Sequence, residues 1–194
     1  MIVMTPALKE MMDNLKFNNS ETFFHAIHVK TLTVKMIKIM NALSITSYTP
    51  FETDCICKGA LLHDLGKLEI ENAILTKDSS LSEEEWEDIK KHPAQSYEMV
   101  KNELSADERE IIKNICLYHH ERVDGNGYNG IADIPLYVQI VSVCDVFDAL
   151  CSDRIYKRGM SREKALEIIE AGKSGHFNKQ ITECLKAVVS GLQE

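Results

Sequence analysis

The sequence predicts an all-α fold, a bundle of about eight helices. Apolar residues recur at helical spacing along most of the chain, and Ser82 and Ser105 each begin a Ser-x-x-Glu stretch that has the form of a capping box. No segment alternates polar and apolar side chains convincingly, as a half-buried strand would. These observations together predict the all-α class, and the motifs described below refine it.

The N-terminal half is expected to open with a short helix and a long one. Thr5 precedes a proline, which is typical of an N-cap followed by Pro at the first helical position. Asn19 or Ser20 caps the long helix, whose apolar residues recur as far as Ile45. A third helix is expected from about residue 52 to residue 64, with Gly66 placed to end it.

The C-terminal half is expected to contain a loop between helices. Pro93 breaks or restarts the helix after His92, and residues 123–133 are polar and glycine-rich. Pro135 then opens an apolar helix. Two amphipathic helices follow, near residues 162–171 and 179–192.

Length and composition indicate one soluble domain over residues 1–194. No linker-like stretch or internal repeat interrupts the chain. No apolar run approaches the roughly 18 to 20 residues that a membrane-spanning helix requires. The six cysteines lie mostly among apolar residues, which favours buried thiols in a reducing compartment. We therefore expect a cytoplasmic protein that does not contact the membrane.

The charge balance excludes a broad nucleic-acid surface. The formal net charge is −8, whereas binding DNA or RNA requires clustered Lys and Arg. A small anionic ligand stays compatible with this charge, because bound metal ions reverse the local field inside a pocket.

Histidine and aspartate residues recur at helix ends and inside one apolar helix face. Each has an ordinary explanation when taken alone, such as a buried ion pair or a favourable charge at a helix terminus. Together they offer the mixed nitrogen and oxygen ligands of hydrolytic Zn, Mn or Fe sites. Adjacent ligands also suit two metal ions that share a carboxylate. The residues concerned are His63, Asp64, His92, His119, His120 and Asp145.

A further candidate ligand pair stands on the second helix. Glu21 and His25 are four residues apart, and therefore lie on one face. His28 shares that face, although a surface or core histidine is the simpler explanation for it. Glu21 taken alone also fits a carboxylate in the first turn of a helix.

Four stretches resemble, in order, the motifs of the HD-GYP family. They are HDLGK (63–67), HPAQSYEMV (92–100), HHERVDGNGY (119–128) and DVFDALCSDRIYK (145–157). Members of this family are bacterial metal-dependent phosphodiesterases with the HD-domain helical fold, and they typically act on cyclic di-GMP. The resemblance covers about residues 20–185.

The resemblance implies a role for each matching residue. Lys67 matches a lysine near the substrate phosphate, and Arg154 and Lys157 match basic residues that hold phosphates. Asp64 and Lys67 would act in catalysis, with Asp64 bridging the ions. Two or three divalent ions are implied, Fe or Mn, with Zn, Mg or Ni as alternatives. Glu21 matches the additional carboxylate ligand of family members that bind three metal ions. The implied ligands are Glu21, His25, His63, Asp64, His92, His119, His120 and Asp145.

The expected activity is hydrolysis of a cyclic dinucleotide, most simply cyclic di-GMP, by a metal-bridging hydroxide. Two alternatives are an HD-type phosphohydrolase for another nucleotide, and a non-catalytic module that binds a cyclic dinucleotide or a partner. The GYP motif here is Gly127-Tyr128-Asn129, which weakens the inference about substrate and about a cyclase partner. Glu121 either orients a metal-binding histidine or is a surface carboxylate. A separate sensor or cyclase protein is a possible partner.

Overall fold

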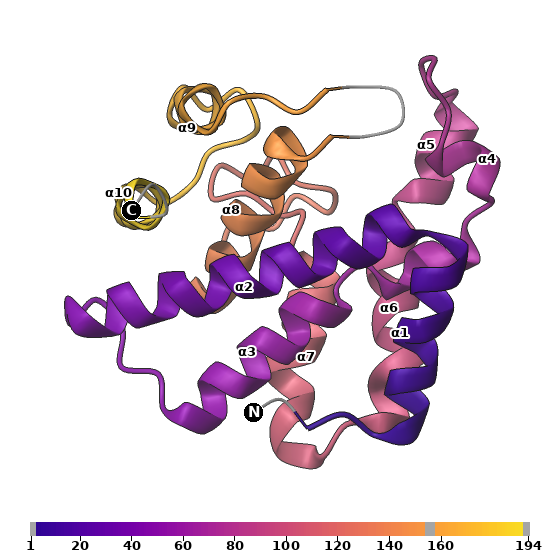
Figure 1. Ribbon diagram of the computed structural model, residues 1–194, viewed down its shortest axis with the longest axis horizontal. Coiled ribbons are helices and arrows are strands. Elements are labelled where there is room, and N and C mark those ends of the chain that lie inside the picture. The colour runs from indigo at the N-terminus through magenta and orange to yellow at the C-terminus, as the bar shows by residue number, and fades with distance from the viewer. Residues whose placement is uncertain (1–2, 154–157, 192–194) are drawn as a thin grey trace.

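The chain folds into a helical bundle around the long helix α2 (Figure 1). The computed structural model describes residues 3–153 and 158–191, and this part contains ten α-helices, two short 3-10 helices and no β-strand. The predicted all-α class is confirmed. The elements are α1 (Pro6–Asn18), α2 (Ser20–Ala42), α3 (Pro50–Leu62), η1 (Leu65–Glu69), α4 (Asn72–Leu75), α5 (Glu83–Ile89), α6 (His92–Val100), η2 (Lys101–Glu103), α7 (Ala106–Tyr118), α8 (Leu136–Cys151), α9 (Arg162–Glu170) and α10 (Lys179–Ser190).

The helix starts follow the capping signals. Thr5 accepts a hydrogen bond from the Leu8 amide at the start of α1, and Asn19 caps α2. Both predicted capping boxes, at Ser82 and Ser105, are formed. Helix α3 starts earlier than predicted, because Thr49 forms a third capping box before Pro50.

Two predicted helix ends are wrong. Helix α2 stops at Ala42 and Ser44 then takes a left-handed conformation (φ 57°), so Ile45 lies beyond the helix and packs against the core from the following turn. Gly66 does not terminate α3, which ends at Leu62. It lies in η1, where a Cβ would overlap the His92 carbonyl oxygen.

Two clusters of buried apolar residues form the core. One joins α2 and α3 to α8, α9 and α10, and the other joins α1, the end of α3 and α7. Helix α2 contributes to both, through Val29 to the first and Ala26 to the second. The cysteines are reduced, and all are buried except Cys151, which is half-buried. Within the described residues no helix is both long and apolar enough to span a membrane.

Candidate metal centre

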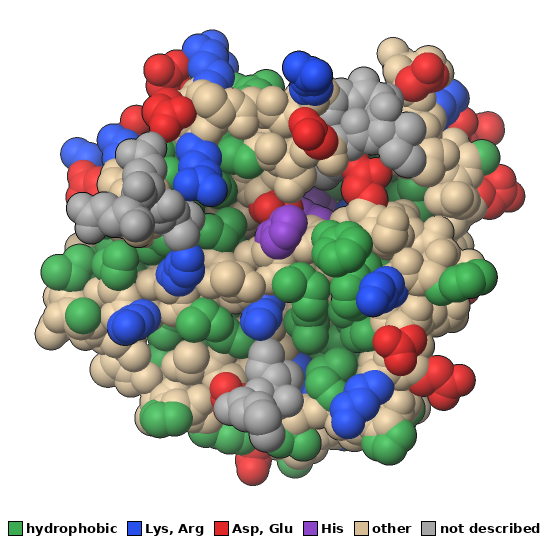
Figure 2. Space-filling view, in the orientation of Figure 1, with side chains coloured by type: hydrophobic (Ala, Val, Ile, Leu, Met, Phe, Trp, Pro, Cys, Tyr) green, Lys and Arg blue, Asp and Glu red, His purple; other side chains and the backbone are tan. Residues whose placement is uncertain are grey.

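Histidine and aspartate side chains from five parts of the fold converge on one buried place. The structure arranges seven of the eight predicted ligands in two groups, and within each group the candidate ligand atoms all lie within 4.8 Å of one another. The first group contains Asp64, His92, His119 and His120, and the second contains His25, His63 and Asp145. A hollow with histidine and acidic side chains is visible on one face of the molecule (Figure 2).

Helix ends orient three of the histidines. His63 closes α3 and its Nδ1 lies 2.8 Å from the Ala60 carbonyl oxygen. His92 opens α6 with Nδ1 2.6 Å from Ile89 O, and Nδ1 of His119 lies 2.9 Å from Cys116 O. A carbonyl oxygen only accepts, so each Nδ1 must carry the proton. Each Nε2 of these rings, when neutral, is therefore a bare lone pair.

These lone pairs face one another. Nε2 of His92 lies 3.3 Å from Nε2 of His119 and 3.2 Å from Nε2 of His120. No hydrogen bond can join His92 to His119, because neither Nε2 has a proton to donate. Several nitrogen lone pairs directed at one point repel each other unless a cation lies between them.

Asp64 presents one carboxylate oxygen to each group. Its Oδ1 lies 3.2 Å from Nε2 of His92 and 3.9 Å from Nε2 of His119. Its Oδ2 lies 3.5 Å from Nε2 of His63 and 3.8 Å from Nε2 of His25. This is the orientation that a carboxylate shared by two ions would adopt.

Asp145 also faces both groups, from the apolar helix α8. Its Oδ1 lies 2.9 Å from Nε2 of His25, and its Oδ2 lies 4.0 Å from Nδ1 of His120. The other nitrogen of His25, Nδ1, lies 2.7 Å from Asp148 Oδ2. Asp148 was not predicted, yet it holds His25 as an outer carboxylate holds a metal-binding histidine.

Burial and neighbouring charge shift the pKa values in this cluster. Burial lowers the pKa of His63, and with the nearby histidines it lowers that of His119 well below the ordinary range. Burial likewise lowers the pKa of His120 to about 3. Burial alone would raise the pKa of Asp64, but Lys67 and His63 outweigh it and hold the pKa well below 3.8. The neutral imidazoles of these three histidines, beside the ionised Asp64, are the protonation states that bind metal.

The donor set fits divalent metal ions. His63 Nε2 and Asp64 Oδ1 are buried and have no hydrogen-bond partner. Buried polar atoms without partners are costly, and cations between the two groups would satisfy both. The buried cluster therefore indicates divalent metal binding.

Two adjoining cavities open beside the cluster. The histidine cavity, of about 390 Å³, is lined by cluster residues together with Arg122, Tyr128 and residues of α8. The tryptophan cavity, of about 460 Å³, lies between α2, the segment 74–81 and α5. His25, Lys67 and Ile89 line both cavities.

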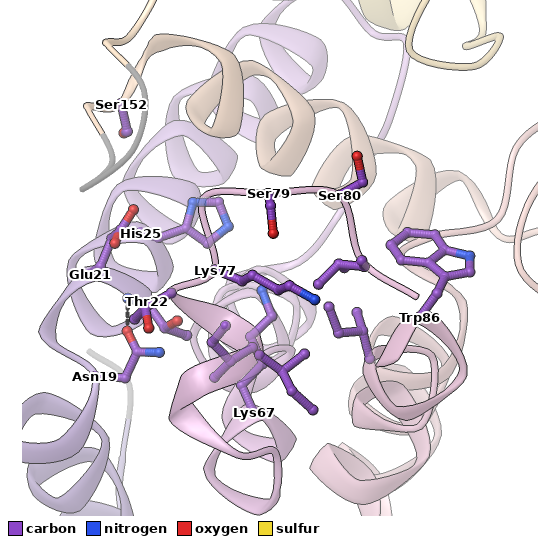
Figure 3. Close-up of a pocket in the computed structure, with 15 residues that line it drawn as sticks. Asn19, Glu21, Thr22, His25, Lys67, Lys77, Ser79, Ser80, Trp86 and Ser152 are labelled. Carbon is purple, nitrogen blue, oxygen red and sulfur yellow. Dashed lines mark hydrogen bonds between the residues drawn. The ribbon is translucent and has the colours of Figure 1, made fainter. Parts of the chain in front are cut away.

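Lys67, a predicted phosphate-binding residue, lies at the boundary between the two cavities. Its Nζ donates a hydrogen bond to Asp64 Oδ2 at 2.6 Å. The other two predicted phosphate contacts, Arg154 and Lys157, lie outside the described residues. Glu21 is not in either group of ligand atoms and lines the tryptophan cavity, one helical turn before His25 (Figure 3).

His28 is a surface residue, as its simpler explanation predicted. Its side chain is 56% exposed, and its Nδ1 lies 3.2 Å from Asp148 Oδ1. Asp148 thus contacts both His25 and His28, while the Ser152 hydroxyl donates to Asp148 Oδ2.

Glu121 is neither a surface carboxylate nor a partner of a histidine ring. It is 1% exposed, and its Oε1 accepts hydrogen bonds from the backbone and side-chain nitrogens of Asn129, both at 2.9 Å. Its Oε2 accepts from the Ile131 amide. Glu121 therefore holds the loop in which the GYP motif is altered. Asp124 stabilises the turn of this loop by accepting a hydrogen bond from the Asn126 amide.

The held loop places Tyr128 against the cluster. Its ring stacks on the His120 imidazole, with the centroids 4.3 Å apart and the planes at 28°. Tyr128 also forms a T-shaped contact with Trp86, with the ring centroids 5.8 Å apart. The carbonyl of His119 is fixed by hydrogen bonds from Arg122 and Ser142.

This helical fold and its buried His/Asp cluster define a class of protein, the HD-domain proteins. The family model described as HD domain matches residues 33–181, and the chain belongs to this family. The match confirms the resemblance that the ordered motifs predicted.

Several named proteins are similar to this chain. A "Cyclic di-GMP phosphodiesterase" of Vibrio cholerae is 35% identical over 96% of this chain and 39% of its own length. A "3'3'-cGAMP-specific phosphodiesterase 2" of the same organism is 36% identical over 69% of this chain and 26% of its own length. Bd1817, an HDG"Y"P protein from Bdellovibrio bacteriovorus, has a similar structure (TM-score 0.66, 25% identity), with 87% of this chain and 52% of that chain covered. The chain thus spans about two fifths of the length of the first of these relatives.

Proposed function

We propose that the chain is a metal-dependent phosphodiesterase that hydrolyses a cyclic dinucleotide, most simply cyclic di-GMP. The observation that carries this proposal is the orientation of the buried ligands. Backbone carbonyls fix three Nε2 lone pairs toward one place, and Asp64 presents one oxygen to each ligand group. Such an arrangement would suit two ions, and two-metal sites recur in phosphoester hydrolysis.

The metal ligands in this proposal are the predicted ones. The first group would hold one ion and the second group another, with Asp64 between them. Glu21 is retained as the ligand of an optional third ion because it lies beside His25. The nitrogen-rich donor set suits Fe or Mn, with Zn, Ni and Mg as alternatives. The full set is Glu21, His25, His63, Asp64, His92, His119, His120 and Asp145.

The protein side chains would bind and orient the phosphodiester. Bound divalent ions would supply Lewis acidity, which lowers the pKa of water and neutralises charge on the phosphoryl oxygens. Lys67 lines both cavities, so its ammonium group would face the phosphate oxygens as negative charge develops on them. Arg154 and Lys157 are proposed to hold the remaining phosphate.

The names of relatives support the substrate class. One is called a cyclic di-GMP phosphodiesterase and another is called specific for 3'3'-cGAMP, and both names denote cyclic dinucleotide hydrolysis. A second candidate substrate is therefore 3'3'-cGAMP. The site in this chain retains every predicted histidine and aspartate ligand in one cluster, which argues against a module that only binds.

A hydrolysis assay tests this proposal. Manganese- or iron-loaded protein is incubated with cyclic di-GMP and, separately, with 3'3'-cGAMP, and the products are separated by chromatography. We expect hydrolysis that stops when a chelator removes the metal and that is lost in Asp64→Ala. Asp54→Ala serves as the matched control, because Asp54 lies on α3 outside both ligand groups. Binding of both dinucleotides without hydrolysis would contradict the proposal.

A further inference from the structure

The tryptophan cavity is a separate compartment next to the metal centre. It shares His25, Lys67 and Ile89 with the histidine cavity, but its other walls come from the start of α2, the segment 74–81 and α5. The proposed chemistry uses this second compartment, of about 460 Å³, only where Glu21, His25 and Lys67 border it, and leaves its other walls without a role.

The walls of this compartment suit a flat, partly polar ring. Trp86 on α5 is 41% exposed and faces the cavity, which is unusual for so large an apolar side chain (Figure 3). Ile74, Leu75, Leu81 and Ile89 add apolar surface, whereas Asn19, Thr22, Ser79 and Ser80 supply hydrogen-bonding groups. Purine bases have this combination of an apolar face and a polar edge.

The charges favour a neutral base over a phosphate in this compartment. Lys77 points into the cavity, but its ammonium group is bonded to both carboxylate oxygens of Glu85, at 2.6 and 2.8 Å. Its charge is therefore compensated. Lys67 is the lysine at the border with the histidine cavity, where a phosphate would sit.

An aromatic array connects the compartment to the metal centre. The rings of Trp86 and Tyr128 meet in a T-shaped contact, and Tyr128 stacks on His120. A cyclic dinucleotide has two bases joined through two phosphodiester links. When one link lies at the ligand cluster, a base attached to it must extend away from the cluster.

We infer that the tryptophan cavity is a nucleobase subsite, in which one purine of the cyclic dinucleotide stacks on the indole of Trp86. The inference rests on the proposed function and deepens it, because it assigns the place where the substrate is held away from the reacting phosphate. Trp86 contacts the substrate base in this arrangement and makes no contact with the reacting atoms.

The fluorescence of the protein reports this contact directly, because Trp86 is the only tryptophan in the sequence. Manganese-loaded protein is titrated with the phosphorothioate analogue of cyclic di-GMP, which resists hydrolysis. We expect saturable quenching of the indole emission, at the same concentration at which calorimetry detects binding. Calorimetric binding with unchanged emission would overturn the inference.

Substitutions separate stacking from a structural effect. Trp86→Leu should raise KM for cyclic di-GMP about tenfold, the scale of one lost base–aromatic stack, and leave kcat within about twofold. Trp86→Phe keeps an aromatic face and should restore most of the affinity. Phe51→Leu is the matched control, since Phe51 is 52% exposed and lies away from both cavities. An unchanged KM in Trp86→Leu would overturn the inference.

The simple diester bis(p-nitrophenyl) phosphate distinguishes the two proposals. If the loaded protein hydrolyses this diester while the analogue leaves Trp86 emission unchanged, the subsite is wrong and the metal-dependent phosphodiesterase stands. If the analogue quenches the emission of Trp86 while neither cyclic di-GMP nor bis(p-nitrophenyl) phosphate is hydrolysed, the subsite stands and the proposed activity is wrong.

Discussion

Single hydrogen bonds decide which nitrogen of each buried histidine is available to a metal. His63, His92 and His119 each donate Nδ1–H to a carbonyl near a helix end, so the protein backbone sets the tautomer. His25 differs, because a side chain, Asp148, contacts its Nδ1. The bond to Asp148 is thus the one outer contact in this set that a substitution can remove.

Asp148→Asn should weaken metal binding without unfolding the protein. The asparagine amide fills the same space, but it does not provide the charged acceptor that orients His25. Loss of such an outer partner lowers metal affinity roughly 10- to 100-fold. Competition with a chelator of known affinity measures the effect. Ser152→Ala is the control, since it removes only one hydrogen bond to Asp148 and should change affinity less than about threefold. Equal affinities in Asp148→Asn and wild type would contradict this role.

The sequence predicted the ligands better than their supports. The ordered motifs identified His63, Asp64, His92 and the other residues that the structure brings together, because each motif is local in sequence. The supports depend on distant contacts. Asp148 is 123 residues from His25, and only its position three residues after Asp145, on the same helix face, offered a signal.

At the scale of single elements, the loop at residues 121–131 shows how the fold accommodates the altered GYP motif. Asn129 gives Glu121 two hydrogen bonds, one from its backbone and one from its side chain. A proline at this position would offer neither. The loop around Tyr128 is therefore held by hydrogen bonds, a contact that no local sequence pattern predicted.

Asn129→Pro, which restores the family motif, should destabilise this protein. The change removes two donors to a buried carboxylate, and we expect a loss of roughly 2 to 3 kcal/mol in the free energy of unfolding. Asn129→Ala keeps the backbone donor and should cost about 1 kcal/mol. Urea denaturation of metal-free protein measures both. A proline variant as stable as wild type would show that the bonds to Glu121 contribute little.

The close contact of η1 with α6 makes a second prediction at this scale. Gly66→Ala would drive a Cβ into the His92 carbonyl oxygen and the Ser96 amide, which are backbone atoms that cannot rotate away. We expect a loss of about 3 kcal/mol or more, together with weaker metal binding, because His92 would move. Gly191→Ala is the control: its nearest contact is 3.5 Å away and its φ is −74°, so its stability should stay within about 0.5 kcal/mol. Similar stabilities of the two variants would contradict the packing explanation for Gly66.

Across the whole molecule, the ligand cluster joins α2, α6, α8 and the ends of α3 and α7. Periodicity and capping signals predicted these helices but not how the helices pack. The histidine and tryptophan cavities beside the cluster could therefore not be predicted from sequence. Metal ions that bind only the folded chain must stabilise all five parts together.

The stability of the metal-free protein should therefore depend on pH in a defined way. Burial lowers the pKa of His63, His119 and His120 below 6.5, so the unfolded chain binds more protons as the pH falls. Burial alone would lower the pKa of His25 too, but its bonds to Asp145 and Asp148 raise it to about 9. The stabilisation from His25 is complete below pH 6.5 and is lost as the pH rises through about 9.

Maximum stability of metal-free protein is thus expected near pH 6.5. The urea midpoint should fall from pH 7 to pH 5, as the lowered histidines favour the unfolded chain, and it should also fall from pH 7 to pH 9, as His25 loses its proton. Manganese at 1,000 times its dissociation constant should raise the free energy of unfolding at pH 7 by about 4 kcal/mol, and the urea midpoint should rise with it. A midpoint that is constant from pH 7 to pH 5 would contradict the protonation states assigned to the cluster.

We propose that this cluster is a metal centre with Asp64 as the shared ligand. Anomalous diffraction from a crystal of manganese-loaded protein tests it most directly, because the signal locates each ion. We predict two peaks about 3.5 to 4 Å apart, one among His92, His119 and His120 and the other among His25, His63 and Asp145, with Asp64 contacting both. Full occupancy of manganese elsewhere, with no peak between these side chains, would contradict the account.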